Sequence, residues 1–137
     1  MSWHESKYRV SYGDTDCMGV VYYANYLEFF ERSRTELLRD AGLPYSEMEA
    51  SGVYFPVVEA QLKYISSARY DDLLTLKSYV ASARGVRLEI VTQVWRDDEL
   101  LVSGKVTLAS VGADRKPRRL PECIIKISEL YKGDSDE

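Results

Sequence analysis

The chain has 137 residues, of which 45% are hydrophobic and 29% charged, a composition typical of one globular domain (1–137) with its own core. Its formal net charge of -4 argues against a general nucleic-acid binder, which presents a basic surface. Cys17 and Cys123 have neither the spacing of a disulfide framework nor that of a zinc site, which favours a reducing compartment. The sequence shows no signal-peptide pattern and no apolar run of about 18 residues. We therefore expect a cytoplasmic protein without an integral membrane segment.

A strand, a loop and a long helix are predicted first. Residues 8–12, YRVSY, alternate apolar and polar side chains at the period of a half-buried strand, and His4 is expected in a mobile tail before it. A helical pattern starts at Tyr23 and ends at Gly42, which predicts roughly 17 helical residues. Its apolar positions are Leu27, Phe30, Leu37 and Ala41, interrupted by Ser33 and Arg34.

A short helix and four strands are predicted next. Ser46 and Glu49 have capping-box spacing before Gly52, which indicates the short helix. The strands are expected at 53–65, 72–83, 86–96 and 100–111, with Leu88, Ile90, Thr92 and Val94 on one face. The turns between them are short, which favours antiparallel neighbours. PECIIKISEL at 121–130 fits a strand or a short helix, and 132–137 are expected to fray.

These elements predict an α+β architecture in which a curved antiparallel sheet wraps a long central helix. The helix is the only large partner available to bury the apolar face of the sheet. Such a sheet leaves open edges, and an unpaired edge is a template for a second copy of the chain. We therefore expect a symmetric dimer.

The loop DTDCMGVVYYANY at 14–26 carries the candidate chemistry. The first backbone N–H groups of a helix lack intrahelical partners and lie at the positive end of its dipole, so they stabilise an oxyanion. Asp14 or Asp16, a few residues earlier, is ionised at neutral pH and could attack a carbonyl or take a proton from water. Gly19 lets the backbone approach a ligand closely.

Other readings of this loop remain. An aspartate before a helix is more often a cap or a turn former than a catalyst. A calcium loop does not fit, because a ligand position falls on Met18 and the twelfth position is Asn25. Tyrosines 22, 23 and 26 suit packing. A histidine triad would have to use His4, and Cys17 has no evident activating base.

The segment YGDTDCMGVVYYANYLEFFERSRTELL at 12–38 resembles the N-terminal signature of hotdog-fold acyl-CoA thioesterases. The similarity is to the 4-hydroxybenzoyl-CoA thioesterase-like family, including its small bacterial branch associated with the Tol-Pal genes. It continues through YISSARYDDLLTL at 64–76 and RKPRRLP at 115–121. The resemblance implies a hotdog fold, a homodimer or homotetramer, and hydrolysis of a short-chain or aromatic acyl-CoA without a cofactor, since coenzyme A is part of the substrate.

The resemblance also assigns roles to residues. It implies that Asp16 is the catalytic carboxylate, as nucleophile or general base, and that the backbone amide of Tyr23 polarises the thioester carbonyl. Gly19 and Val20 are expected at the substrate, and Arg84 matches a position near the nucleotide-binding surface. Many members of the Tol-Pal branch have histidine where this chain has Tyr23, so a histidine acid–base role does not carry over, whereas backbone polarisation does.

Several alternatives stay open at the level of sequence. Other cations for the phosphates of coenzyme A are Lys63, Arg69, Arg87 and the cluster at 114–119. Glu59 could face the site from a partner subunit. A non-catalytic hotdog module that binds acyl carrier protein or another protein is the main alternative, because a fold does not fix a function. A dehydratase is the lesser one, since it would typically need a histidine.

Overall fold

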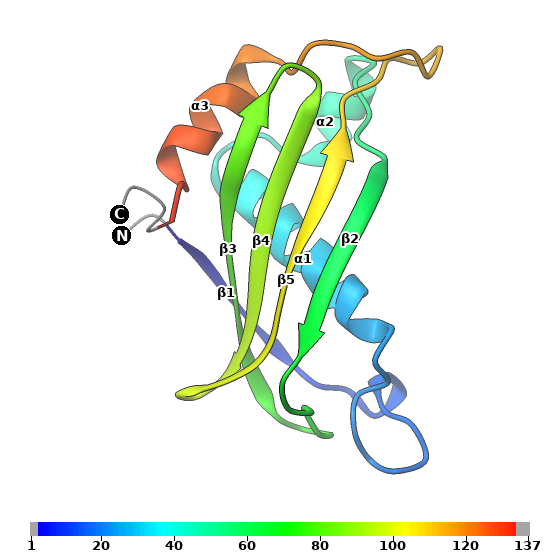
Figure 1. Cartoon of the computed structure of the whole chain (residues 1–137), viewed down its shortest axis with the longest axis vertical. Helices are drawn as coiled ribbons and strands as arrows, with labels where there is room; N and C mark the ends of the chain where they lie inside the picture. The colour runs from blue at the N-terminus through cyan, green and yellow to red at the C-terminus, as the bar shows by residue number, and fades with distance from the viewer. Residues whose placement is uncertain (1–2, 134–137) are drawn as a thin grey trace.

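The computed structural model describes residues 3–133 as an antiparallel sheet with one long helix lying across a face (Figure 1). The strands are β1 (His4–Arg9), β2 (Val57–Tyr64), β3 (Leu73–Arg84), β4 (Arg87–Arg96) and β5 (Glu99–Ala109). The helices are α1 (Asn25–Asp40), α2 (Tyr45–Ala50) and α3 (Glu122–Leu130), with a short 3-10 turn, η1 (Tyr12–Asp14). This is the expected α+β arrangement.

The sheet has five strands in the order β1-β3-β4-β5-β2, and every neighbouring pair is antiparallel. Tight turns join β3 to β4 and β4 to β5, where Gly85 and Asp97 adopt φ of 63° and 51°. On β4 the four predicted inward side chains are all buried. Gly104 on β5 has no room for a Cβ, which would lie 2.5 Å from the Gln61 carbonyl oxygen of β2.

Helix α1 has 16 residues, close to the predicted length, and it packs against β1, β3 and β4. Its buried side chains include Phe29, Phe30, Leu37 and Leu38. The polar interruption is buried too: the Ser33 hydroxyl is 2.6 Å from that of Ser78, which is 2.7 Å from that of Thr92. The Ser78 hydroxyl on β3, itself bonded to Thr92 on β4, thus satisfies Ser33 inside the core. Leu27, predicted on the apolar face, is instead 44% exposed.

The N-terminal strand lies earlier than predicted. Strand β1 begins at His4, which pairs with Ser78 of β3, and it ends at Arg9, so the mobile-tail prediction for His4 is wrong. The His4 side chain is buried, and its Nε2 lies 2.7 Å from Oδ2 of Asp40 at the end of α1. A long-range strand pairing therefore orders this polar segment.

Two smaller predictions also differ from the structure. Helix α2 begins after Pro44 as its N-cap and has no side-chain cap, so Ser46 does not form the expected capping box. The ambiguous segment at 121–130 is the helix α3. Of the tail expected to fray, 134–137 lie outside the described residues, whereas Gly133 is described and buried.

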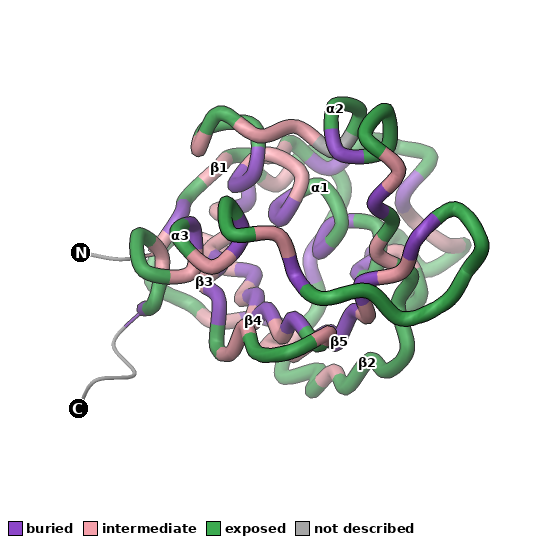
Figure 2. The backbone as a smooth tube through the Cα atoms, turned by 90° about the horizontal axis from the view of Figure 1, so that it is seen from above, coloured by how far each residue is buried: buried purple, intermediate pink, exposed green. Residues whose placement is uncertain are grey.

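The two edges of the sheet differ in their cover. Strand β2 is exposed at every residue except the half-buried Leu62, and Figure 2 shows it as a mostly exposed border of the molecule. Val57 and Val58 are 49% and 55% exposed. Strand β1, at the other edge, has the charged Glu5, Lys7 and Arg9 as its exposed residues. Of the two edges, β2 is therefore the one that exposes aliphatic side chains.

Candidate functional site

The loop before α1 folds into a small hairpin that we call the site hairpin, residues 14–22. Thr15 and Val21 form an antiparallel bridge, and the Asp16 N–H donates to the Val20 carbonyl at 2.9 Å. The turn is closed by the Gly19 N–H donating to the Asp16 carbonyl at 3.1 Å, and Gly19 has a φ of 80° that favours glycine. Asp16 thus begins the turn, which projects below the start of α1 in Figure 1.

The two aspartates of the hairpin have different surroundings. Asp14 is buried, and its Oδ2 accepts hydrogen bonds from the Tyr8 hydroxyl at 2.6 Å and from the Ser11 N–H and hydroxyl at 2.9 and 3.0 Å. Asp16 is half-buried and accepts one hydrogen bond, from the Met18 N–H to Oδ1 at 2.8 Å. The structure therefore makes Asp14 a cap of η1, whereas Asp16 holds its turn through Oδ1 and leaves Oδ2 without a donor among the described residues.

Unpaired amides lie at the start of α1. The Asn25 N–H donates to the Tyr22 carbonyl at 2.9 Å, which makes Tyr23 and Ala24 the central residues of a turn. Within residues 3–133, the N–H groups of Tyr23 and Ala24 have no hydrogen-bond acceptor, and no side chain caps the helix. These two donors lie at the positive end of a 16-residue helix, where an oxyanion is stabilised.

A second loop, residues 65–72, holds the hairpin and the helix together, and we call it the bracket loop. The Ala68 carbonyl accepts the Val21 N–H at 2.9 Å, and the Ala68 N–H donates to the Tyr26 hydroxyl at 3.0 Å. Ala68 is fully buried, and burial raises the pKa of Tyr26. Val20 also bridges to Arg69. One residue, through its N–H and its carbonyl, therefore fixes the carboxylate hairpin relative to the first turn of α1.

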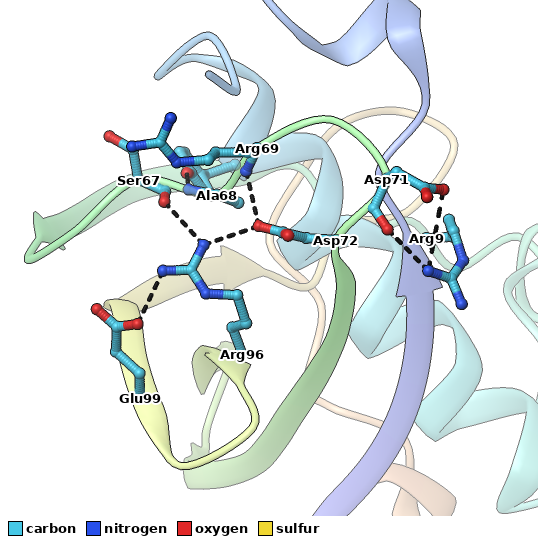
Figure 3. Close-up of polar contacts among 9 residues, drawn as sticks. Arg9, Ser67, Ala68, Arg69, Asp71, Asp72, Arg96 and Glu99 are labelled. Atoms are coloured by element: carbon cyan, nitrogen blue, oxygen red, sulfur yellow. Dashed lines mark hydrogen bonds and ion pairs between the residues drawn. The ribbon is translucent and has the colours of Figure 1, made fainter. Parts of the chain in front are cut away.

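Arg96 anchors the bracket loop from below (Figure 3). Its guanidinium donates to Asp72 Oδ2 at 2.8 Å, to Glu99 Oε1 at 2.8 Å and to the Ser67 carbonyl at 3.3 Å. Hydrogen bonds to Glu99 and Asp72 raise the pKa of Arg96, and the bond from Arg96 lowers the pKa of Glu99. Sequence analysis missed this network, because Arg96 meets residues 24 and 29 positions away only in the folded sheet.

Exposed aromatic and apolar side chains surround the hairpin. Tyr23 is 61% exposed, and the hydroxyl of Tyr64, at the end of β2, donates to the Tyr23 carbonyl at 3.2 Å. Burial raises the pKa of Tyr64. The other exposed members are Met18, Tyr22, Ile65 and Tyr70. Tyr26 differs from its neighbours because it lies in the core, as its assignment to packing predicts.

The structure distributes the predicted cations over both ends of the sheet. Lys63 and Arg69 are exposed at the end that carries the hairpin. Arg84 lies at the opposite end of β3, a strand of 12 residues that spans roughly 36 Å when straight. Arg87 and the cluster at 114–119 lie at that far end too (Figure 1). Glu59 is exposed on β2 and accepts a hydrogen bond from Gln61. Within one chain, Arg84 is therefore not beside Asp16.

Comparison with known proteins gives consistent matches over most of the chain. Residues 10–127 match the Thioesterase-like superfamily. Over 119 residues, 85% of its length, the chain is 37% identical to "Acyl-CoA thioester hydrolase YbgC" of Escherichia coli O6:H1, of which the match covers 89%.

Solved structures agree with these matches. A probable thioesterase from Bartonella henselae is 39% identical with a TM-score of 0.82, covering 87% of this chain and 99% of that one. A DHNA-CoA thioesterase from Staphylococcus aureus is 28% identical with a TM-score of 0.86, covering 96% of this chain and 89% of that one. Both carry the sheet-and-helix arrangement described above.

Proposed function

We propose, from the premise that this chain belongs to the Thioesterase-like superfamily, that it is an acyl-CoA thioesterase. The substrate class is a short-chain or aromatic acyl-CoA, and water is the second reactant, so no cofactor is needed. Similarity to the Escherichia coli thioester hydrolase over 85% of the chain supports the activity. The unpaired carboxylate oxygen of Asp16 is the observation that carries the mechanism, because a binding module has no use for it.

Asp16 is the reacting carboxylate of this proposal. As a general base it takes a proton from water, whose oxygen attacks the thioester carbon; the carbon–sulfur bond then breaks and coenzyme A leaves as a thiolate. As a nucleophile its own oxygen attacks, the carbon–sulfur bond breaks, coenzyme A leaves as a thiolate, and water hydrolyses the resulting anhydride. The Met18 N–H orients the carboxylate through Oδ1 and leaves Oδ2 for either step. Single turnover in oxygen-18 water distinguishes them, since only the nucleophile path can leave the label in the Asp16 carboxylate.

The amides at the start of α1 supply the other half of the mechanism. The Tyr23 N–H, with Ala24 beside it, donates to the thioester oxygen, whose negative charge grows as the tetrahedral intermediate forms. Val20 lies opposite Asp16 in the hairpin, because its carbonyl accepts the Asp16 N–H. Tyr23 follows Val20 by three residues, so the backbone between them spans at most about 10 Å. The carboxylate and the two amides thus belong to one small region. Gly19 and Val20 form the backbone that a thioester would pass.

Partners follow from the same proposal. Arg69, which bridges to Val20, and Lys63, exposed at the same end of the sheet, are the candidate cations for the phosphates of coenzyme A, and Arg84 is the candidate from a second copy of the chain. Acyl carrier protein is the alternative carrier of the acyl group. We place the protein in the cytoplasm, because its two exposed free cysteines suit a reducing compartment. We propose a homodimer or homotetramer, because the exposed edge strand β2 can pair with a second copy. No helix of the described chain could cross a membrane.

Thiol release from a panel of acyl-CoA and acyl carrier protein thioesters, followed with Ellman's reagent, tests the activity. We expect Asp16→Asn to lower kcat by about a hundredfold or more and to leave the melting temperature unchanged, because the substitution is nearly isosteric. Full turnover by Asp16→Asn would remove Asp16 from the mechanism. Binding of carrier protein without hydrolysis of any panel member would instead favour the non-catalytic module.

A further inference from the structure

Each of the two free amides at the start of α1 belongs to a peptide group whose carbonyl accepts a hydrogen bond. The Tyr23 N–H shares its peptide group with the Tyr22 carbonyl, which accepts the Asn25 N–H at 2.9 Å. The Ala24 N–H shares its peptide group with the Tyr23 carbonyl, which accepts the Tyr64 hydroxyl at 3.2 Å. The first bond belongs to the backbone turn, whereas the second comes from a side chain at the end of β2. A side chain can therefore tune the Ala24 amide.

The rings around Tyr64 hold its side chain in one orientation. Its ring meets that of Tyr23 edge-on, with centroids 6.2 Å apart, and lies 5.7 Å from that of Tyr26. Tyr26 is buried, and its hydroxyl accepts the Ala68 N–H at 3.0 Å. The backbone of Tyr64 pairs with Val102 of β5. The hydroxyl thus approaches the Tyr23 carbonyl from a fixed position.

Folding alone does not require this hydrogen bond. Tyr23 and Tyr64 are 61% and 48% exposed, so water could satisfy the same carbonyl. The Tyr23 carbonyl also accepts the Tyr26 N–H at 3.4 Å in the first turn of α1. The large cost in stability arises when a buried polar group loses its partner, which is not the case here. The bond is better explained by its effect on the amide than by its contribution to the fold.

We propose that Tyr64 is a positioning residue of the thioesterase reaction, which strengthens the Ala24 N–H as a donor to the thioester oxygen. A hydrogen bond to a peptide carbonyl draws electron density from the nitrogen of the same peptide group, so its N–H becomes a stronger donor. As negative charge grows on the thioester oxygen, the two bonds reinforce each other, which stabilises the transition state more than the bound substrate. This inference rests on the proposed function and adds a residue to it.

Tyr64→Phe removes the hydroxyl and keeps the ring, and thiol release from the best substrate of the panel measures the effect. We expect kcat to fall about fivefold with KM and the melting temperature unchanged, because the lost bond weakens a transition-state donor rather than a binding contact. Tyr70→Phe is the matched control, since Tyr70 is an exposed tyrosine of the bracket loop whose hydroxyl bonds to no other described residue. It should change neither kcat nor KM.

Incorporation of 3-fluorotyrosine at position 64 tests the donor directly, because its phenol is more acidic while the ring keeps its place. At about pH 6 the phenol is protonated and donates a stronger hydrogen bond, so kcat should exceed that of the wild type. Burial, and then the neighbouring Tyr23 phenol, raise the pKa of Tyr64, and Tyr26 is the other titratable group that faces it within residues 3–133. Ionisation at alkaline pH removes the bond and lowers kcat, and fluorination should move this fall to lower pH.

Three results would overturn the inference. Wild-type kcat in Tyr64→Phe is one, and a pH profile that fluorination does not shift is another. The third is a loss of activity in Tyr64→Phe that a lower melting temperature or a higher KM accounts for, since it would make Tyr64 a purely structural residue. The proposed function still stands after any of them if the wild type hydrolyses the panel and Asp16→Asn does not. A wild type without turnover would remove the proposed function and this inference together.

Discussion

At the residue scale, Asp14 and Asp16 show how neighbours set the role of a carboxylate. Both precede the same helix and have the same intrinsic acidity. Asp14 is enclosed by donors from Tyr8 and Ser11, so its charge is committed to holding β1, η1 and the hairpin together. Asp16 has one donor and more solvent, so its charge is available to a ligand. Stability and activity should therefore depend on different aspartates.

Asp14→Asn tests this division. The amide has no negative charge to offer Tyr8 and Ser11, and hydrogen bonds to a charged group contribute about 1.5–3 kcal/mol. We expect the free energy of unfolding to fall by about 2 kcal/mol in urea titrations, whereas Asp16→Asn should unfold like the wild type. A normal stability for Asp14→Asn would mean that the buried carboxylate is not a structural anchor.

At the scale of elements, the site depends on one junction between three segments. The site hairpin, the first turn of α1 and the bracket loop meet at Ala68, whose carbonyl holds Val21 and whose N–H donates to Tyr26. The bracket loop is in turn held by Arg96 from β4. Because the sheet positions the loop and the loop positions the hairpin, the place of Asp16 is set by strands that never touch it.

The junction should loosen at alkaline pH. Burial raises the pKa of Tyr26 above its value in the unfolded chain, so the folded state holds this proton more tightly. The stabilisation is complete below about pH 10, the unfolded value, and is lost as the pH rises through the folded pKa. We expect the unfolding free energy of the wild type to fall above about pH 10 more steeply than that of Tyr26→Phe. Equal slopes, measured by denaturant titrations from pH 8 to 11, would exclude Tyr26 as the group responsible.

Sequence patterns predicted the elements well wherever one local rule decided them. The alternation in β4 identified its buried face, and the helical spacing after Tyr23 identified α1. They failed where a distant partner decides: His4 is ordered by pairing with Ser78, and Ser33 is buried because the Ser78 hydroxyl on β3 bonds to it. For the same reason, the sequence identified the loop at 14–26 as the candidate site but did not separate the roles of Asp14 and Asp16. The donors that surround Asp14 come together only in the folded chain.

At the scale of the whole molecule, the two sheet edges suggest which surface meets a second chain. A row of unpaired backbone groups promotes edge-to-edge pairing unless charged side chains protect it. The exposed residues of β1 are Glu5, Lys7 and Arg9, whereas β2 begins with two exposed valines. Strand β2 also ends at Tyr64, which donates to the Tyr23 carbonyl at the start of α1. An interface along β2 would therefore adjoin the proposed site as well as bury the edge.

A lysine placed on each edge separates the two possibilities. Val58→Lys puts a charge on the β2 edge, which would face the second copy in the proposed homodimer. We therefore expect the dimer dissociation constant to rise at least about tenfold. Activity per chain should fall in parallel as the dimer dissociates, because the second copy supplies Arg84, the proposed partner of the coenzyme A phosphates. Glu5→Lys makes a matched change on β1 and should alter neither quantity. If Glu5→Lys dissociates the dimer and Val58→Lys does not, the interface lies along β1 and the proposed interface along β2 is wrong.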